Sequence, residues 1–225
     1  MHQANTAILL FSRSLEEEFK AKSFGLTSQR FKRFYNALLR KIRRTLKSTT
    51  LPVFEIDSNL QQGNSFGERL VNAIRQVQQQ GFDKILILGN DTLELNASLL
   101  HQAISDLRQG KNTLGKDVHG GCYLIGLQAK STDLEALQHV HWQSGQVYDQ
   151  VSTLLGVTTT LPELTDLNGK KDLRLLIGSA LLPKAYLIQL LQWLFPHKES
   201  HTQRSLSSWA RIQRQLVLRG PPHLV

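Results

Sequence analysis

A short run of aliphatic residues near the middle of the chain constrains the fold more than any other feature. Residues 85–88 are Ile-Leu-Ile-Leu, with polar residues on both sides. A run of this length is typical of a strand buried on both faces, as in a parallel sheet covered by helices. Residues 89–92 end this strand, and Asn96 opens a predicted helix. Open α/β sheets bind ligands just past the carboxyl ends of their strands, so Asp91 is the first candidate for chemistry.

The rest of the chain alternates between similar strands and amphipathic helices. Further strands are predicted at residues 6–11, 52–56, 112–115, 122–127 and 157–161. Further helices are predicted to begin at Thr27, at Ser65 (where Glu68 completes a capping-box pattern), near Gly145 and at Gly169. Residues 12–24 are predicted to be a polar loop and 116–121 a turn. The alternation predicts an α/β fold, with a single mostly parallel sheet and helices on both faces.

The predicted α/β domain covers residues 1–178. Two amphipathic helices, at residues 183–195 and 202–218, predict a C-terminal helical extension over residues 179–225 that packs on the same domain. One cysteine, Cys122, excludes an internal disulfide and a multi-cysteine metal site. No apolar run approaches the roughly 20 residues that span a bilayer, and the start of the chain is not typical of a signal peptide. These features predict a cytoplasmic protein without a membrane span.

The net charge of +9 comes from two basic regions, one within residues 20–47 and one from Arg174 onward, where seven Lys or Arg accompany one Glu. Between Phe19 and Phe54 there is no acid, and ten bases are present: Lys20, Lys22, Arg30, Lys32, Arg33, Arg40, Lys41, Arg43, Arg44 and Lys47. A solvated helix face explains most of them better than a nucleic-acid interface, because no aromatic platform accompanies the charges. Nucleic acid is therefore the less favoured partner.

The loop after the first strand carries Arg13, Lys20 and Lys22. In α/β proteins this loop commonly holds the phosphates of a nucleotide, although a solvated surface loop accounts for the same residues equally well. Farther along, Gly63 and Gly67 precede a predicted helix and could let a flat base or a phosphate approach the backbone. The sequence thus offers a candidate nucleotide site made of Arg13, Lys20, Lys22 and Gly67.

A series of motifs, in order, resembles one bacterial family over roughly residues 6–177. The motifs are Gln61-x-Gly63-x-x-Phe66-Gly67-Glu68-Arg69, Leu88-Gly89-Asn90-Asp91, Gly120-Gly121-x-Tyr123-Leu124-Ile125-Gly126-Leu127, Trp142 and Asp166-x-Asn168-x-x-x-Asp172. The chain resembles domain of unknown function 2064, whose members are often labelled glycosyltransferases of the arsenosugar-biosynthesis type. The resemblance implies a glycosyltransferase-A-like, Rossmann-like fold that uses a nucleotide-diphospho-sugar and transfers its sugar to a small-molecule acceptor.

The resemblance also implies roles for individual residues. Asp91 would be a catalytic acid that binds Mg²⁺ or Mn²⁺, with Asp166 and Asn168 as further metal ligands, since hard cations prefer oxygen ligands. Gln61 would contact the nucleotide base. The sugar and acceptor side would be lined by Gly120, Gly121 and Trp142.

The chain departs from the family pattern at three places. The first loop lacks the family's Pro and Gly, an asparagine (Asn168) replaces the second acid of the late pair, and His119 replaces an aspartate. His119 could take over catalysis only as a neutral base. The sequence therefore predicts a metal-assisted glycosyltransferase. It leaves open a nucleotidyltransferase of the same fold that releases pyrophosphate, or a catalytically degenerate protein that binds a nucleotide or polyanion.

Overall fold

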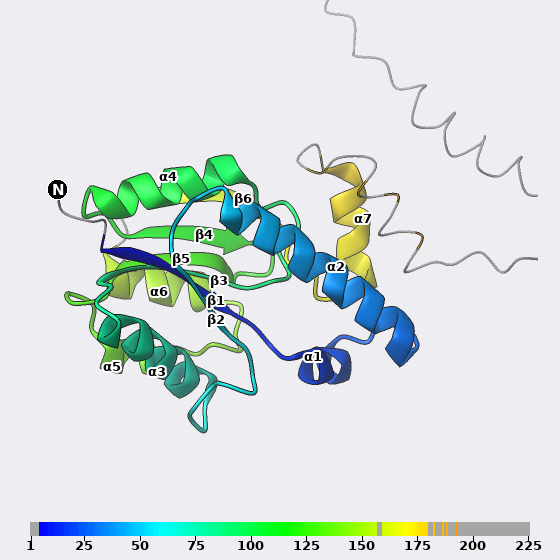
Figure 1. Cartoon of the computed structure of the whole chain (residues 1–225), viewed down its shortest axis with the longest axis horizontal. Coiled ribbons are helices and arrows are strands. Elements are labelled where there is room, and N and C mark those ends of the chain that lie inside the picture. The colour runs from blue at the N-terminus through cyan, green and yellow to red at the C-terminus, as the bar shows by residue number, and fades with distance from the viewer. Residues whose placement is uncertain are drawn as a thin grey trace, which may run out of the picture. The chain divides into compact units, whose positions relative to one another are not determined.

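The computed structural model describes residues 5–156 and 159–179, together with Leu182, Tyr186, Ile188 and Gln192. Its described part contains one six-stranded sheet (Figure 1). The strands are β1 (Thr6–Phe11), β2 (Val53–Ile56), β3 (Lys84–Leu88), β4 (Thr113–Asp117), β5 (Cys122–Gln128) and β6 (Thr159–Leu164). They lie in the order β2-β1-β3-β5-β4-β6, and only β5 runs antiparallel to its neighbours. The prediction of one mostly parallel sheet is confirmed.

The reversed direction of β5 follows from its short connection to β4. Only residues 118–121 join the two strands, and a parallel pair would need a crossover of a dozen residues or more. Gly120 makes the turn possible with a φ of +85°, a backbone conformation that disfavours residues with a side chain. β5 then runs back between β3 and β4 and joins the two parallel halves of the sheet.

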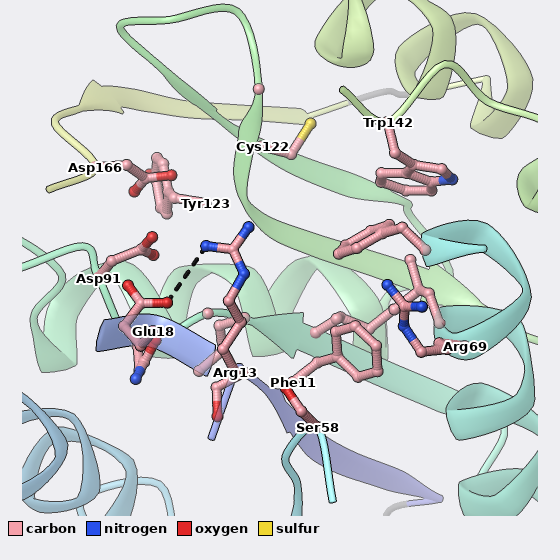
Figure 2. Close-up of a pocket in the computed structure, with 18 of the residues that line it drawn as sticks. Phe11, Arg13, Glu18, Ser58, Arg69, Asp91, Cys122, Tyr123, Trp142 and Asp166 are labelled. Carbon is pink, nitrogen blue, oxygen red and sulfur yellow. Dashed lines mark hydrogen bonds and ion pairs between the residues drawn. The ribbon is translucent and has the colours of Figure 1, made fainter. Parts of the chain in front are cut away.

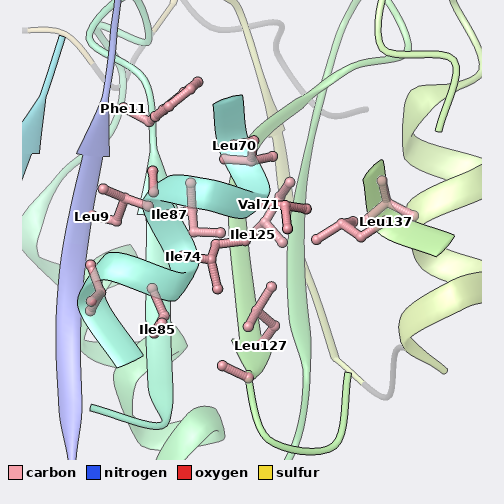
Figure 3. Close-up of a cluster of buried hydrophobic side chains, with 14 of the residues drawn as sticks. Leu9, Phe11, Leu70, Val71, Ile74, Ile85, Ile87, Ile125, Leu127 and Leu137 are labelled. Atoms are coloured by element: carbon pink, nitrogen blue, oxygen red, sulfur yellow. The ribbon is translucent and has the colours of Figure 1, made fainter. Parts of the chain in front are cut away.

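Helices cover both faces of the sheet. They are α1 (Leu15–Ala21), α2 (Ser28–Lys47), α3 (Phe66–Gln79), α4 (Ala97–Arg108), α5 (Leu134–Gln138), α6 (Val147–Leu155) and α7 (Lys170–Gly178). Successive residues of β1 point to opposite faces. Leu9 joins a buried cluster with residues of α3, α5 and α6 (Figure 3), whereas Ile8 and Leu10 join a cluster with residues of α2 and α4. The continuous apolar strands at the centre of the sheet are therefore buried on both sides.

The predicted helix starts at Thr27, Ser65 and Asn96 are all present as N-caps. The hydroxyl oxygen of Ser65 accepts a hydrogen bond from the backbone N–H of Glu68 at 3.1 Å. The Glu68 carboxylate accepts from the N–H of Asn64 rather than from that of Ser65, so only half of the expected capping box forms. Thr27 begins α2 without a side-chain capping bond.

These two caps give a matched test of what a capping hydrogen bond contributes. Ser65→Ala removes the acceptor for the Glu68 N–H and is expected to lower the free energy of unfolding by about 1 kcal/mol. Thr27→Ala removes a side chain that makes no capping bond and should cost less. Urea denaturation of both variants measures the difference. Equal losses would show that the Ser65 hydrogen bond does not contribute at this site.

The structure corrects the prediction of a polar loop over residues 12–24. Helix α1 occupies residues 15–21; Ser14 is its N-cap and three glutamates stand in its first turn, where the helix dipole favours acids. A helix of seven residues is marginal by itself, and α1 is stabilised by packing of Leu15 and Phe19 against α2 and its neighbours. The short helix α5 was also not predicted, and β4 continues through Lys116 and Asp117, which were expected in the turn.

The remaining boundaries agree with the predictions to within a few residues. Strand β6 begins at Thr159 and ends at Leu164, and residues 157–158 lie outside the described residues. By its contacts the chain separates into residues 1–194 and 195–225. The predicted C-terminal helices at 183–195 and 202–218 lie outside the described residues, except for Tyr186, Ile188 and Gln192. The helical extension beyond residue 178 therefore stays a prediction. None of the helices in the described residues is long and apolar enough to cross a membrane.

Candidate functional site

A cavity of about 710 Å³ opens at the carboxyl ends of the strands. It is lined by the loops that follow β1, β2 and β3, by the β4–β5 turn, and by residues just before α6 and α7. The chain passes from β1 outward to β2 and then crosses back to β3 on the other side of β1. The crevice between β1 and β3 is therefore the point where the strand order reverses, which is where α/β sheets bind ligands.

Asp91 lies in this cavity directly after β3, and a lysine holds it. The ammonium group of Lys22 donates a hydrogen bond to Asp91 Oδ2 at 2.7 Å and lies 3.3 Å from Glu18 Oε1. Burial disfavours the charge of Lys22, but Asp91 and Glu18 outweigh it and raise the pKa of Lys22 above its ordinary value. Lys22 is therefore a protonated cation at the position where a metal ion on Asp91 would be expected.

Asp166 lies beside Asp91 and is almost completely buried. Its Oδ1 accepts a hydrogen bond from the hydroxyl of Thr92, and a β-bridge joins the backbones of these two residues. Burial, followed by the negative charges of Asp91 and Asp117, raises the pKa of Asp166 well above its ordinary range. The carboxylates of Asp91, Asp117 and Asp166 therefore repel one another, and further negative charge among them is unfavourable.

Acids outnumber bases around the cavity as a whole. The lining carboxylates are Glu16, Glu17, Glu18, Asp91, Asp117 and Asp166, whereas the lining arginines and lysines are Arg13, Lys22 and Arg69. Figure 2 places Glu18, Asp91 and Asp166 on one side, Trp142 and Arg69 on the other, and the Arg13 side chain between them. Arg13 also forms an ion pair with Glu18 at 3.3 Å. An anionic ligand would need a further cation here.

The donor set can be compared with what a divalent cation requires. Within residues 5–156 and 159–179, no group of three or more His, Cys, Asp or Glu side chains is arranged to hold a metal ion. Asp91, Asp166 and Asn168 nevertheless all line the cavity. Two carboxylates and an amide oxygen suit Mg²⁺ or Mn²⁺, which take their remaining ligands from phosphate and water. The congestion around Asp166 is of the kind that a bound cation relieves, so the residues fit such an ion once Lys22 leaves Asp91.

His119 projects from the β4–β5 turn and is paired with an acid from α7. Its Nε2 lies 3.2 Å from Asp172 Oδ1. The other oxygen of Asp172 accepts the backbone N–H groups of Asn168 and Gly169, each at 2.7 Å, at the start of α7. The turn itself is held by Asp117 Oδ1, which accepts the N–H groups of His119 and Gly121. Both ends of the histidine–aspartate pair are therefore fixed by backbone hydrogen bonds.

The opposite wall of the cavity is aromatic. The rings of Phe66 and Trp142 lie 5.1 Å apart, and those of Phe11 and Phe66 lie 5.6 Å apart at nearly right angles. The indole N–H of Trp142 donates to the carbonyl of Leu137, which fixes the ring. Aromatic surfaces of this kind suit the flat face of a base or of a sugar ring.

Nine of the predicted site residues line the cavity. They are Arg13, Lys22, Gln61, Asp91, His119, Gly121, Trp142, Asp166 and Asn168. The amide nitrogen of Gln61 donates to the carbonyl oxygens of Ser12 and Ile56, so it ties the loops after β1 and β2 together.

Three predicted residues do not line the cavity. Lys20 is exposed and pairs with Glu17 at 2.9 Å. A Cβ at Gly67 would lie 1.9 Å from the carbonyl oxygen of Gln138, so this glycine permits the close packing of α3 on α5. A Cβ at Gly120 would lie 2.1 Å from the carbonyl oxygen of Gly145. Backbone packing accounts for both glycines.

Several residues of the site were not predicted from the sequence. The sequence predicts a loop where Glu18 stands in α1, and a turn where Asp117 ends β4, so neither carboxylate is expected in the site. Asp172 was part of the motif series, but nothing in its spacing indicated that it would meet His119. Phe66 also stood in a quoted motif, and only the cavity shows that it faces the site.

The fold and the cavity together define the class of protein: an α/β protein with a cavity at the strand-order reversal of one mostly parallel sheet. Within this class, the chain belongs to the family described as uncharacterized proteins conserved in bacteria, DUF2064, whose model matches residues 20–144. No curated protein matches the sequence.

The fold is shared with a solved structure. A protein from Desulfovibrio desulfuricans G20, provisionally named a nucleotide-diphospho-sugar transferase, superimposes with a TM-score of 0.67 at 18% identity, over 85% of this chain and 97% of that one. A homologue of Rv0371c from Mycobacterium sp. strain JC1 (TM-score 0.49, 13% identity, 84% and 99% covered) is more distant. Rv0371c from Mycobacterium tuberculosis H37Rv has the same TM-score of 0.49 at 11% identity, over 80% of this chain and 100% of that one.

Proposed function

We propose that the cavity binds a nucleotide-diphospho-sugar and that the protein is a glycosyltransferase. The main support for this proposal is the composition of the cavity, which has acids and Lys22 on one side and an aromatic wall on the other. The cavity also lies at the strand-order reversal and has a volume sufficient for such a ligand. The Desulfovibrio protein of the same fold has been given a name of this class, which supports the choice of ligand.

The charged side of the cavity would hold the diphosphate. A divalent cation on Asp91, Asp166 and the amide oxygen of Asn168 would supply charge stabilisation for the leaving diphosphate. Lys22 would release Asp91 and bind a phosphate oxygen. Arg13, at the centre of the cavity in Figure 2, would bind a second phosphate oxygen. The aromatic wall would take the base or the sugar.

His119 is the candidate base. With Nε2–H donating to Asp172, Nδ1 carries the lone pair and can accept a proton. The acceptor hydroxyl oxygen would attack the anomeric carbon of the sugar, the bond from that carbon to the diphosphate oxygen would break, and its electron pair would leave with the diphosphate. The hydroxyl proton would pass to Nδ1. Asp172 would act as a positioning residue that fixes the tautomer and the orientation of the ring.

A thermal-shift panel of nucleotides and nucleotide sugars, each with and without Mn²⁺, tests the proposal. Because a ligand stabilises the state that it binds, the cognate nucleotide sugar should raise the melting temperature, and more so with the metal. Product analysis then separates the enzyme classes. Release of a nucleoside diphosphate supports glycosyl transfer, and release of pyrophosphate would assign nucleotidyl transfer instead. No stabilisation by any nucleotide would refute the proposal.

Lys22→Met is expected to change two binding affinities in opposite directions. Because the ammonium group of Lys22 competes with a cation for Asp91, its removal should tighten the binding of Mn²⁺ alone. The same change removes a phosphate ligand and should weaken nucleoside-diphosphate binding about tenfold or more. Isothermal titration of each ligand measures both effects. Lys20→Met, at an exposed position outside the cavity, is the control and should change neither. A fall in Mn²⁺ affinity for Lys22→Met would contradict this assignment.

His119→Ala is expected to lower turnover roughly 100-fold and to leave nucleotide binding unchanged, because the base acts in the chemical step. Release of nucleoside diphosphate from the best-binding nucleotide sugar measures it. His141→Ala is the matched control, since His141 is exposed and outside the cavity lining. Unchanged turnover in His119→Ala would make His119 a turn residue only. If His119→Asp created an activity that the natural chain lacks, the natural protein would be a binding protein.

A further inference from the structure

Helix α2 has one face in the core and one face covered with bases. Its apolar side chains, including Phe31, Phe34 and Ile42, are buried. On the opposite side six basic residues are exposed, and we call them the basic face: Arg30, Lys32, Arg33, Arg40, Arg44 and Lys47. At about 100° per residue these six positions fall within roughly half of the helix circumference. Figure 1 shows α2 as one continuous helix that extends from the sheet toward α1.

The basic face is not neutralised within the described part of the protein. Helix α2 contains no acid, and none of the six residues forms an ion pair with an acid in residues 5–156 or 159–179. The neighbouring base Arg43 is the exception on this side, because it pairs with Glu55 at 2.6 Å. The glutamates of α1 line the cavity instead.

The clustering of these charges is unfavourable for the isolated helix. Arg30 and Arg33, Arg40 and Arg44, and Arg44 and Lys47 stand three or four residues apart, where like charges repel across one turn. Because the apolar side of α2 is already buried in the core, the helix does not need these bases in order to fold. An external partner with many negative charges would turn the repulsion into attraction.

The shape and chemistry of the basic face favour one kind of partner. No residue of α2 lines any of the three main cavities of the described structure, so the face offers no groove. The aromatic residues of α2 are buried, and single-stranded nucleic acids are generally held by stacking on exposed aromatic rings. A helix of 20 residues is about 30 Å long and can contact several lipid headgroups at once on a flat surface. Segment 195–225 is an unsuitable occupant, because it carries five Lys or Arg and one Glu.

We infer that the basic face docks the protein on the anionic surface of a lipid bilayer. The attachment is electrostatic and does not insert into the bilayer, since the apolar side of α2 remains in the protein core. Attraction between a basic segment and anionic lipids decays over a Debye length, so salt reverses it. This inference does not depend on the ligand of the cavity.

Vesicle co-sedimentation of the full chain tests the inference. Binding is expected to vesicles of phosphatidylcholine with phosphatidylserine at low salt, and not to phosphatidylcholine alone or at high salt. The variant with Arg33→Gln, Arg44→Gln and Lys47→Gln should bind roughly 100-fold more weakly, which follows from the attraction of three bases near an anionic surface. Its melting temperature should match that of the natural chain, because the three side chains are exposed.

A second triple variant, with Arg75→Gln, Arg108→Gln and Lys111→Gln, removes the same charge from other exposed positions and should bind nearly as well as the natural chain. Equal losses for the two variants would mean that only net charge matters, and would overturn the inference. So would a lack of binding to the phosphatidylserine vesicles at low salt. Tighter binding to a random single-stranded RNA or a DNA duplex at the same salt would assign the face to nucleic acid instead.

Discussion

Asp91→Ala is expected to abolish the Mn²⁺-dependent part of nucleotide stabilisation and to reduce turnover by roughly 100-fold or more. Asp91 is the acid that follows the central strand β3, and it is one of the three proposed metal ligands. Lys22 would keep its contact with Glu18 at 3.3 Å, so the lysine is not left without an acid. A fall in activity would therefore reflect the lost ligand rather than an unpaired buried charge.

Thermal shifts with and without Mn²⁺ and the rate of nucleoside-diphosphate release measure this prediction. Glu135→Gln removes a carboxylate at an exposed position that does not line the cavity, and it should behave like the natural protein. A full Mn²⁺ effect in Asp91→Ala would exclude Asp91 as a ligand. Persistence of both nucleotide binding and turnover would place the chemistry elsewhere.

Gly67→Ala is expected to destabilise the fold by about 3 kcal/mol or more, or to prevent folding. Its Cβ would lie 1.9 Å from the carbonyl oxygen of Gln138 and 3.0 Å from the indole nitrogen of Trp142. Because backbone cannot give way as a flexible side chain can, α3 and α5 would have to separate, and overpacking of a core typically costs about 1–3 kcal/mol even where side chains can adjust. Chemical denaturation measures the loss.

Gly145→Ala is a matched control for this prediction. There the nearest heavy atom, the carbonyl oxygen of His119, would be 3.5 Å from the new Cβ, which is an ordinary contact. We expect a change of less than about 1 kcal/mol, as for most substitutions without a clash. If Gly67→Ala instead folded with natural stability and bound nucleotide more weakly, the sequence-based role of Gly67 near the ligand would be favoured over its role in packing.

The sequence by itself determined the elements whose signals are local. The apolar runs of β1, β3 and β5 predict strands buried on both faces, because only a sheet covered by helices on both sides hides every side chain of such a strand. The caps at Ser65 and Asn96 depend on a bond between residues three positions apart, and a short motif therefore suffices to predict them. The position of Asp91 at a strand end followed from the same local pattern.

Only the tertiary structure decided which of these residues meet. The strand order brings together segments that are far apart in the sequence. Lys22 contacts Asp91 across 69 residues, and His119 pairs with Asp172 across 53 residues. No local spacing encodes such contacts. Helix α1 is too short to be predicted from propensity alone, and it forms because α2 and its neighbours bury its apolar side. The role of Gly67 was likewise decided by α5, an element that had not been predicted. Local patterns specify elements and their ends, whereas the packing of the sheet brings side chains together to form the candidate site.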